Sequence, residues 1–198
     1  MKKIASLTLA LCLACPLSAQ TIANMKDLTA GQKAAATSVK LTGTLTTKGN
    51  SDIRQLRDLC WQLKHVDLST ANCPTLPANA FHSRHRLVSV VLPTNLKSIG
   101  TQAFFACDAL KQLTLPTTLE EVGAAAFSGC SSLESITIEG APRLGGFAFR
   151  GCNNLRSIKL LSKVPPQCDA TAFEGVDIEK CRLEVPAGSE ESYRRAAG

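Results

Sequence analysis

Histidine and cysteine are the residue types in this 198-residue chain that are best suited to bind a metal or to act as nucleophiles. His82 and His85 are three positions apart and Cys73 lies nearby, so these side chains form a candidate metal site. The spacing lacks a Cys-x-x-Cys pair, which is typical of structural zinc sites. Histidines exposed on a turn are therefore favoured, and we expect no metal and no cofactor.

Catalytic groups are equally sparse. Nucleophilic catalysis needs a serine or cysteine that is activated by a histidine, but there is no Gly-x-Ser-x-Gly motif and all three histidines lie near one end of the chain. Glu120 and Glu121 are a candidate carboxylate pair only because they are neighbours in the sequence. Neighbouring acidic residues are more typical of a solvated turn than of an acid–base pair in an active site. We expect no enzyme, and a catalytic role for His82, His85 and a cysteine is the least favoured hypothesis.

The beginning of the chain, residues 1–19, has the pattern of a secretory signal, with Lys2 and Lys3 before a short apolar run and a small residue, Ala19, at the end. The run is shorter than the roughly 20 residues that a transmembrane helix needs, and no later segment is apolar for that long. Cleavage after Ala19 is one expectation. Lipidation of Cys15, as in an outer-membrane lipoprotein, is the alternative. Both predict an exported protein, either secreted or at the cell surface.

The net charge excludes one class of partner. Removal of Lys2 and Lys3 lowers the formal charge from +6 to +4, which is a mild excess without dense basic runs or interleaved aromatic residues. Nucleic-acid binding would require such runs. Acidic partners remain compatible with this charge.

An internal repeat is the strongest pattern in the chain. The dipeptide Ala-Phe recurs so that successive phenylalanines are 23, 23, 22 and 24 positions apart. The five copies are Ala80-Phe81, Ala103-Phe104, Ala126-Phe127, Ala148-Phe149 and Ala172-Phe173.

A second motif, Leu-x-x-Ile-x-Leu, keeps the same period. Its last two apolar residues are two positions apart, so they face the same side of a short strand, and the residue between them faces out. The copies are Leu63/Val66/Leu68, Leu87/Val90/Leu92, Leu110/Leu113/Leu115, Leu133/Ile136/Ile138, Leu155/Ile158/Leu160 and a looser Ile178/Cys181/Leu183.

Proline and glycine mark the ends of these strands. Pro93 and Pro116 should end two strands because proline cannot donate a hydrogen bond. Gly100, Gly123 and Gly145 follow an inward apolar residue, where we expect the chain to turn a corner.

A unit of about 23 residues cannot bury its own apolar side, so the units must stack. The sequence therefore predicts an α/β solenoid of leucine-rich repeat type, with short strands and about five coils of 22 to 24 residues. A signal at 1–19, an N-terminal cap at 20–62, repeat coils at 63–161 and a closing segment at 162–198 are the expected parts.

The N-terminal cap is predicted to be helical. A strand is expected at Ser38–Gly43, and a helix at Asn50–Leu63 is expected to begin with Asn50 or Ser51 as its N-cap. Ile53, Leu56, Cys60 and Leu63 would form its buried side. Trp61 is expected to close the end of the core, and at the other end of the chain Ser189 is expected to cap a short helix.

Seven cysteines follow the signal, a number that suggests disulfides in an exported protein. Their positions in the repeat favour buried, unpaired thiols instead, because cysteine packs as a small hydrophobe. Cys107, Cys130 and Cys152 each follow the repeat phenylalanine by three positions, Cys73 aligns with Leu96 and Leu119, and Cys181 takes an inward strand position. Cys60 and Cys168 remain candidates for pairing or reactivity.

The outward strand residues are the candidate binding site, since they form a ladder across the stacked coils. This ladder becomes more basic toward the C-terminus, and a solvated face without a ligand is the alternative. The ladder comprises Asp67, Val91, Thr114, Thr137, Lys159 and Arg182, flanked by His65, Ser89, Gln112, Ser135, Ser157 and Lys180.

The recurring Leu-x-x-Ile-x-Leu-Pro, Leu-x-x-Ile-Gly and Ala-Phe-x-x-Cys motifs resemble the BspA-type leucine-rich repeat family of bacterial surface proteins, and the flanks resemble its Bacteroides-like members. The likeness covers about Leu63 to Val185. Arg84 and Val176 depart from it by replacing the repeat cysteine. The resemblance implies a secreted or cell-surface adhesion module that binds a host protein, an extracellular-matrix component, a cell surface or a glycan. A structural or assembly module is the alternative.

Overall fold

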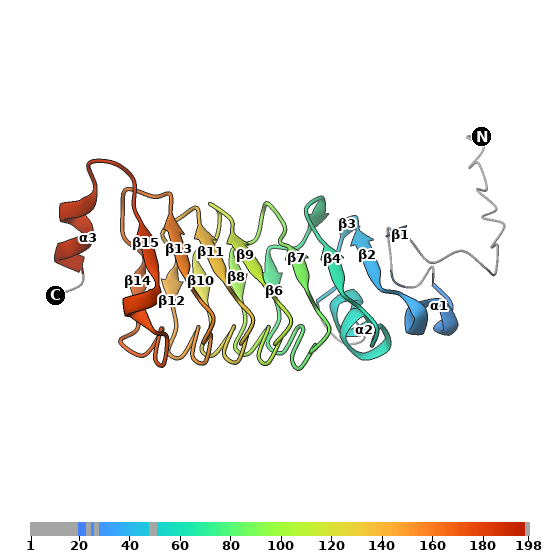
Figure 1. The fold of residues 1–198 in the computed structure, drawn as a ribbon. Coiled ribbons are helices and arrows are strands. Elements are labelled where there is room, and N and C mark those ends of the chain that lie inside the picture. Colours follow the sequence, from blue (N-terminus) through green and yellow to red (C-terminus); the bar gives the residue numbers. More distant parts are fainter. Residues whose placement is uncertain (1–19, 23–24, 26–27, 48–50, 197–198) are drawn as a thin grey trace, which may run out of the picture.

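The computed structural model describes residues 20–22, 25, 28–47 and 51–196. The predicted signal, including Cys15 and Ala19, and the predicted cap residue Asn50 lie outside these residues. The described part is a parallel β-solenoid of about six turns of about 23 residues, so the predicted fold class is confirmed. Figure 1 shows the coils stacked side by side, with α1 and α2 at one end and α3 at the other. None of the described helices is long and apolar enough to cross a membrane.

One strand from each coil contributes to a main row of parallel strands, in which equivalent positions of successive repeats align. Val66, for example, pairs with Val90, and Ile136 pairs with both Leu113 and Ile158. The row consists of β1 (Gln20–Ile22), β2 (Ser38–Leu41), β4 (His65–Asp67), β7 (Ser89–Val91), β9 (Gln112–Leu115), β11 (Ser135–Ile138), β13 (Ser157–Leu160) and β15 (Arg182–Glu184).

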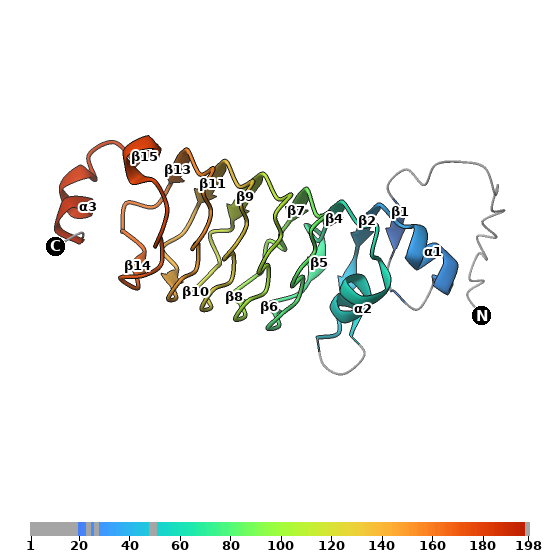
Figure 2. The same ribbon diagram turned by 60° about the horizontal axis from the view of Figure 1, so that its bottom comes forward.

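A second row of two-residue strands runs along another side of the stack, which Figure 2 separates clearly from the main row. Its strands are also parallel. The row consists of β6 (Thr75–Leu76), β8 (Ser98–Ile99), β10 (Glu121–Val122), β12 (Arg143–Leu144) and β14 (Gln167–Cys168). Nearer the N-terminus, β3 (Gly43–Thr44) and β5 (Ala71–Asn72) form a separate two-stranded sheet.

The link between the two rows is the part of the coil that varies in length. It spans 116–120 between β9 and β10, 139–142 between β11 and β12, and 161–166 between β13 and β14. The distance from the second strand to the repeat phenylalanine stays constant. The repeat lengths of 22 and 24 residues therefore arise entirely in this link.

The N-terminal part contains two short helices, α1 (Ala30–Ala35) and α2 (Asp52–Leu59). Strands β1 and β2 of this part continue the main row, so the helices are a minor part of the cap. Helix α2 is shorter than predicted, and its N-cap is Ser51, whose hydroxyl accepts a hydrogen bond from the Arg54 amide.

Buried Asp52 attaches the start of α2 to neighbouring loops. Its carboxylate accepts hydrogen bonds from the amides of Met25 and Thr46 and from the Thr46 hydroxyl, at 2.8–3.2 Å. Burial alone would raise the pKa of Asp52, but these hydrogen bonds outweigh it and the pKa lies below its ordinary value. The carboxylate therefore stays charged and satisfied inside the cap.

The prediction for Trp61 is wrong. Its side chain is 56% exposed, whereas Ile53, Leu56 and Cys60 are fully buried, as predicted. Helix α2 ends at Leu59, so Trp61 lies on the turn after it rather than on its buried side.

Stacked aromatic rings run through the core. Each repeat phenylalanine lies on the next one with a centroid distance of 5.0–5.3 Å and an interplanar angle of 7–16°. Phe81, Phe104, Phe127 and Phe149 are fully buried. Burial of one such side chain contributes roughly 1.5–3 kcal/mol, so this column is a major source of stability.

The turn that carries each Ala-Phe pair is bonded to its neighbours as regularly as the strands are. The amides of Gln102, Phe104 and Ala106 donate to the following coil, and the amides between them donate within the turn. This alternation requires left-handed backbone at two positions per coil. Those positions include non-glycine residues such as Gln102 and Ala106, with φ near 55°. This segment consists of successive tight turns rather than a helix.

The repeat cysteines form a buried column beside the phenylalanines. The thiols of Cys107, Cys130 and Cys152 donate to backbone carbonyls of the preceding coil at 3.1–3.3 Å. All seven cysteines in the described part of the chain are free of disulfides. The prediction of buried, unpaired thiols is therefore confirmed for Cys107, Cys130 and Cys152, which form the column, and for Cys73, but it is wrong for Cys181, which is only half-buried.

The glycine that follows each of β8, β10 and β12 has a different role from the one expected. Gly100, Gly123 and Gly145 do not have positive φ. A Cβ on Gly123 would instead lie 2.6 Å from the backbone nitrogen of Thr101 in the preceding coil. The Gly123 amide also donates to the Ile99 carbonyl at 2.8 Å, so close approach of two backbones is the constraint.

Beyond β14, the last coil contains a 3-10 helix, η2 (Ile178–Lys180), then β15 and helix α3 (Glu190–Ala196). Ser189 precedes α3, and its hydroxyl donates to the Pro186 carbonyl at 2.6 Å, which connects the helix start to the turn before it. No residue of α3 is buried.

We predict that Gly123→Ala lowers the free energy of unfolding by at least about 2 kcal/mol, because the new methyl group meets backbone atoms that cannot move independently. Urea unfolding followed by circular dichroism would measure this. Gly31→Ala is the matched control, since a Cβ there meets nothing within 4 Å, and it should leave stability unchanged or raise it. Equal effects of both substitutions would contradict the close-approach argument.

The thiol column should make stability depend on alkaline pH. Burial raises the pKa of Cys107 and Cys152 to about 12, and raises that of Cys130 as well. Above the ordinary thiol pKa near 9 the unfolded chain loses these protons while the folded chain keeps them. The free energy of unfolding should therefore fall as pH rises from 9 toward 12, by about 1.4 kcal/mol per pH unit for each thiol.

Urea titrations at pH 8 and pH 10.5 would test this. The triple variant Cys107→Ala/Cys130→Ala/Cys152→Ala should show a shallower fall than the unmodified chain. Equal slopes would contradict burial of the three thiols. Alkylation after denaturation without reductant, followed by mass spectrometry, should count all seven thiols as free.

Candidate functional site

The outward residues of the main row form a continuous surface, which we call the strand face. It consists of two parallel columns, because each strand places two side chains outward on either side of an inward one. One column contains Lys40, Asp67, Val91, Thr114, Thr137, Lys159 and Glu184, and the other contains Ser38, His65, Ser89, Gln112, Ser135, Ser157 and Arg182.

The predicted ladder is therefore correct from Asp67 to Lys159 but wrong at its end. Arg182 pairs with Ser157 and lies in the second column, whereas Glu184 pairs with Lys159. The loose sixth repeat shifted the predicted register by two residues. As a result Leu183, rather than Cys181, takes the first inward position of the last strand.

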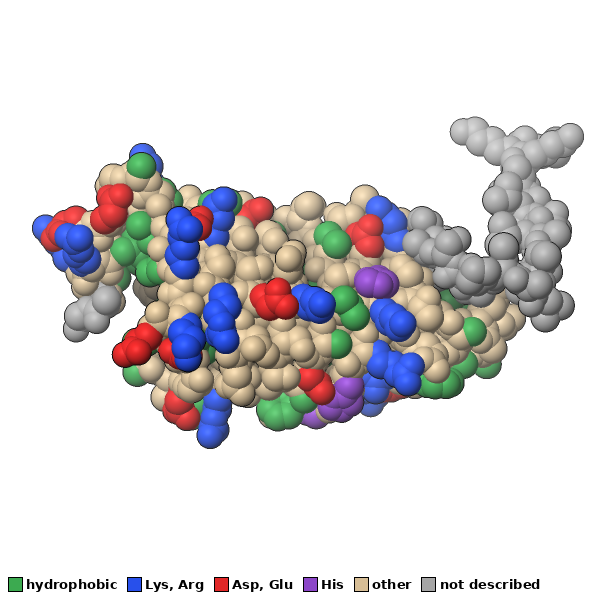
Figure 3. Space-filling view, viewed as in Figure 1, with side chains coloured by type: hydrophobic (Ala, Val, Ile, Leu, Met, Phe, Trp, Pro, Cys, Tyr) green, Lys and Arg blue, Asp and Glu red, His purple; other side chains and the backbone are tan. Residues whose placement is uncertain are grey.

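This shift changes the charge of the strand face. Arg182 forms an ion pair with Glu184 at 3.2 Å, and at the other end Lys40 pairs with Asp67 at 2.9 Å. Of the basic residues predicted at the C-terminal end of the ladder, only Lys159 therefore remains in its predicted column. Figure 3 shows Lys and Arg side chains over the C-terminal coils with Asp and Glu side chains among them, and further basic side chains toward the N-terminal end.

The centre of the strand face is uncharged. Val91 is 49% exposed although it is a large apolar residue, and Thr114 and Thr137 continue its column. In the other column His65 Nδ1 lies 2.8 Å from the Ser89 hydroxyl.

The three side chains of the candidate metal site have separate partners. His82 stacks on Phe105 with a centroid distance of 5.0 Å, and His85 Nδ1 lies 2.6 Å from Asp108. Cys73 is fully buried. Among the described residues no group of three His, Cys, Asp or Glu side chains could hold a metal ion. Of the two candidate carboxylates, Glu120 pairs with Lys97 at 2.9 Å.

The two cysteines singled out as pairing or reactive differ from each other. Cys60 is fully buried, which raises its pKa to about 11, so the prediction that it is reactive is wrong. Cys168 is exposed on the edge strand β14. Cys181 is half-buried before β15 instead of lying inward on a strand.

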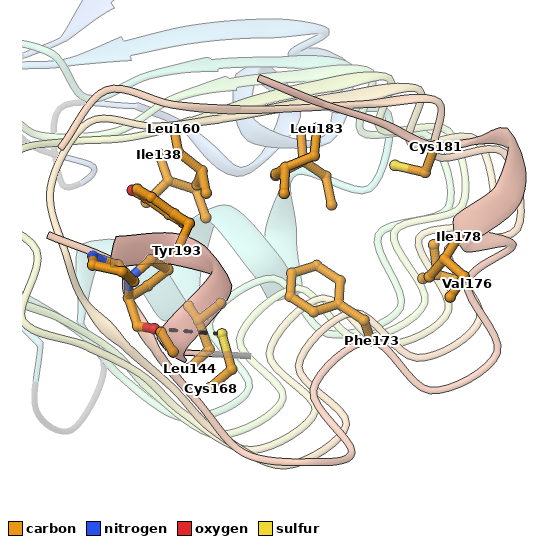
Figure 4. A pocket seen from close by; sticks show the side chains of 14 residues that line it. Ile138, Leu144, Leu160, Cys168, Phe173, Val176, Ile178, Cys181, Leu183 and Tyr193 are labelled. Carbon is orange, nitrogen blue, oxygen red and sulfur yellow. Dashed lines mark hydrogen bonds between the residues drawn. The ribbon is translucent and has the colours of Figure 1, made fainter. Parts of the chain in front are cut away.

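An apolar cavity of about 620 Å³ lies at the C-terminal end of the stack, which the sequence did not predict. Figure 4 shows Tyr193 of α3, Phe173, Leu183 and Ile178 around it. The Tyr193 hydroxyl donates to the Ser162 carbonyl at 2.7 Å and so attaches α3 to the link before β14. Ile178 and Leu183 are 75% and 56% exposed, so the last coil leaves part of the core uncovered.

A cluster of guanidinium groups lies where α2 meets the first repeat turn. Asp58 accepts two hydrogen bonds from Arg57 at 2.7 and 3.2 Å and lies 3.6 Å from Arg54. Arg84 completes the cluster, and its Nη1 donates to the Arg57 carbonyl at 2.7 Å. The sequence marked Arg84 as a departure from the repeat cysteine but gave no reason to group it with residues of α2.

Several solved structures have the same fold. A leucine-rich repeat protein from Bacteroides ovatus is 24% identical over 84% of this chain, with a TM-score of 0.51. The T. pallidum leucine-rich repeat protein is 20% identical over 83% of this chain and 72% of its own length, with a TM-score of 0.53. The pneumococcal vaccine antigen PcpA is 18% identical over 82% of this chain, with a TM-score of 0.54.

This chain spans 41% of the Bacteroides protein and 38% of the pneumococcal one, so the likeness concerns the repeat fold alone. No curated protein matches the sequence. The family model described as "BspA type Leucine rich repeat region" matches six copies over residues 74–190, which is more than half of the chain. The chain therefore belongs to the BspA-type leucine-rich repeat family.

Proposed function

We propose that the protein is an exported binding or adhesion module that contacts a protein or glycan ligand through its strand face. The observation that carries this proposal is the exposed Val91 within an uncharged, hydroxyl-rich centre, with charged pairs at both ends. Such a surface combines an apolar contact with hydrogen-bonding groups around it. Leucine-rich repeat proteins are generally binding proteins rather than enzymes, which agrees with the scattered histidines.

The size of the strand face favours a macromolecular ligand. Seven strands from β2 to β15 contribute side chains, and parallel strands are about 4.8 Å apart, so the face is roughly 30 Å long. The main-chain groups of β2, β4, β11 and β13 are paired with strands on both sides, which leaves recognition there to side chains. Host extracellular-matrix proteins and surface glycans are the proposed ligands, and the cell surface or the secreted fraction is the proposed location.

We predict that Lys159→Glu weakens binding to the ligand about tenfold at low salt and less at high salt, because an exposed charge is screened by ions. Val91→Asp should weaken binding at every salt concentration, since it replaces the apolar contact.

Ligands from an extracellular-matrix panel and a glycan array would be measured by biolayer interferometry. Lys163→Glu, a change of the same charge in the link before β14, is the matched control. Affinities unchanged by both strand-face substitutions would remove the strand face as the binding surface.

A second function, assembly with other copies of the chain, is favoured by the apolar cavity at the C-terminal end. Exposed Ile178 and Leu183 would be covered if two such ends met.

We predict for this alternative that the chain dimerises with increasing concentration and that Ile178→Glu/Leu183→Glu returns it to a monomer. Light scattering over a hundredfold concentration range measures the mass. A monomer at every concentration would contradict assembly and leave the strand-face proposal standing.

A further inference from the structure

A straight column of mostly charged side chains borders the strand face. Its members directly precede the residues of the second column of that face in the sequence. Each one donates a main-chain hydrogen bond to the equivalent carbonyl of the preceding coil, at 2.8–3.4 Å. All of them are exposed except the half-buried Val88. We call this set the edge column, and it consists of Lys64, Val88, Lys111, Glu134 and Arg156.

The edge column carries positive charge that neighbouring acidic residues do not neutralise. Within the part of the chain that the structure describes, neither Lys64 nor Lys111 forms an ion pair, and Arg156 uses only its Nη1, which donates to two backbone carbonyls. Three positive charges and the one negative charge of Glu134 leave a net charge of +2 on the column. The acidic residues of the strand face have partners of their own, in the ion pairs Lys40–Asp67 and Arg182–Glu184.

The positive charges recur at every second coil. Val88 separates Lys64 from Lys111, and Glu134 separates Lys111 from Arg156. Neighbouring parallel strands are about 4.8 Å apart, so successive cations lie roughly 10 Å apart along the stack. This interval is fixed at the main chain, because every member of the column is hydrogen-bonded to the next.

The adjacent column of the strand face supplies uncharged hydrogen-bonding groups. Ser89, Gln112, Ser135 and Ser157 directly follow members of the edge column and lie in β7, β9, β11 and β13. Their hydroxyl and amide groups can donate to and accept from sugar hydroxyls. A sugar chain presents hydroxyls on every ring and can use these groups along its whole length, whereas an acidic peptide presents mainly carboxylates.

We infer that the edge column and the adjacent serine-rich column bind a linear acidic glycan in which a uronic acid alternates with a neutral sugar. A sugar ring in an extended chain is about as long as one strand spacing, so one carboxylate per disaccharide matches cations at every second coil. Successive carboxylates would lie at Lys64, Lys111 and Arg156, and a neutral sugar would lie at Glu134. This inference rests on the proposed function, because it names the class of ligand for the strand face.

Isothermal titration calorimetry with a hyaluronan octasaccharide tests the inference, because that glycan carries one carboxylate per disaccharide. It should bind saturably at low salt and at least tenfold more weakly at high salt, where exposed charges are screened. The same octasaccharide with its carboxylates reduced to alcohols should not bind. An oligoglutamate peptide of equal length, which represents an acidic protein ligand, should bind at least tenfold more weakly than hyaluronan.

Variants of the cations locate the site. Lys111→Gln removes the central cation and should weaken hyaluronan binding severalfold, the amount that one exposed charge pair contributes. The triple variant Lys64→Gln/Lys111→Gln/Arg156→Gln should abolish binding. Lys163→Gln, at a lysine in the link before β14, is the matched control and should bind normally. The four side chains are exposed, so all of these variants should keep the circular dichroism spectrum of the unmodified chain.

Glu134→Gln tests the spacing of the charges. In the inferred register Glu134 lies opposite a charged sugar only when the glycan carries a charge on every ring, as heparin does. The substitution should therefore strengthen binding of a heparin octasaccharide severalfold more than binding of the hyaluronan octasaccharide. Equal strengthening of both would overturn the match between charge spacing and disaccharide length.

Three other results would also overturn the inference: no hyaluronan binding at low salt, oligoglutamate binding as tight as that of hyaluronan, or hyaluronan binding that survives the triple substitution. The proposed function fails separately. A protein ligand whose binding Val91→Asp weakens would support the strand face even if hyaluronan did not bind, and would leave only the glycan inference refuted.

Discussion

Stacking of one coil on the next through main-chain hydrogen bonds is the constraint on which the whole structure depends. A unit of about 23 residues has no core of its own, and its apolar side chains are buried only when a neighbour covers them. The strands of both rows and the turns that carry the Ala-Phe pairs all donate to adjacent coils. Three sides of each coil are therefore held at one spacing, and that spacing is what allows the phenylalanine rings to stack at about 5 Å.

The same constraint explains which side chains are free to carry function. Inward positions are fixed by packing, and Gly123 is fixed by the backbone of the preceding coil. Outward strand positions meet only solvent and their neighbours in the column, so Val91 and Lys159 can vary without affecting the core. The strands hold a fixed spacing, so a binding surface of this molecule is determined by which side chains stand at the outward positions.

Most of the fold could be predicted from the sequence, because residues that occupy the same position in successive repeats are the ones that stack on one another. The period gave the parallel strands, the phenylalanine column and the thiol column from Cys107 to Cys152. Prediction was poorer where the repeat degrades. Arg182 was placed two residues out of register because Ile178, Cys181 and Leu183 only loosely follow the motif. The role of Trp61 depended on where α2 ends, which helix signals locate poorly.

The arginine cluster could not be predicted in this way, since it joins residues of α2 to a turn 27 positions later through contacts that no periodicity encodes. The cavity beside α3 was missed for a related reason. It arises from what a short helix leaves uncovered, and only the three-dimensional arrangement of Tyr193 and Phe173 reveals it.

The variable link between the two strand rows also has a consequence for engineering. The link spans residues 139–142 in one coil and 161–166 in the next, so its length already differs by two residues within this chain. The pairing of the strands in both rows is nevertheless maintained. A peptide tag or a recognition loop inserted at this point would project from the solenoid without altering the contacts that hold it. Insertion of a single residue anywhere else in the coil would displace a hydrogen-bonded row, so a designer who wishes to extend this protein has two options, a longer link or an entire additional coil.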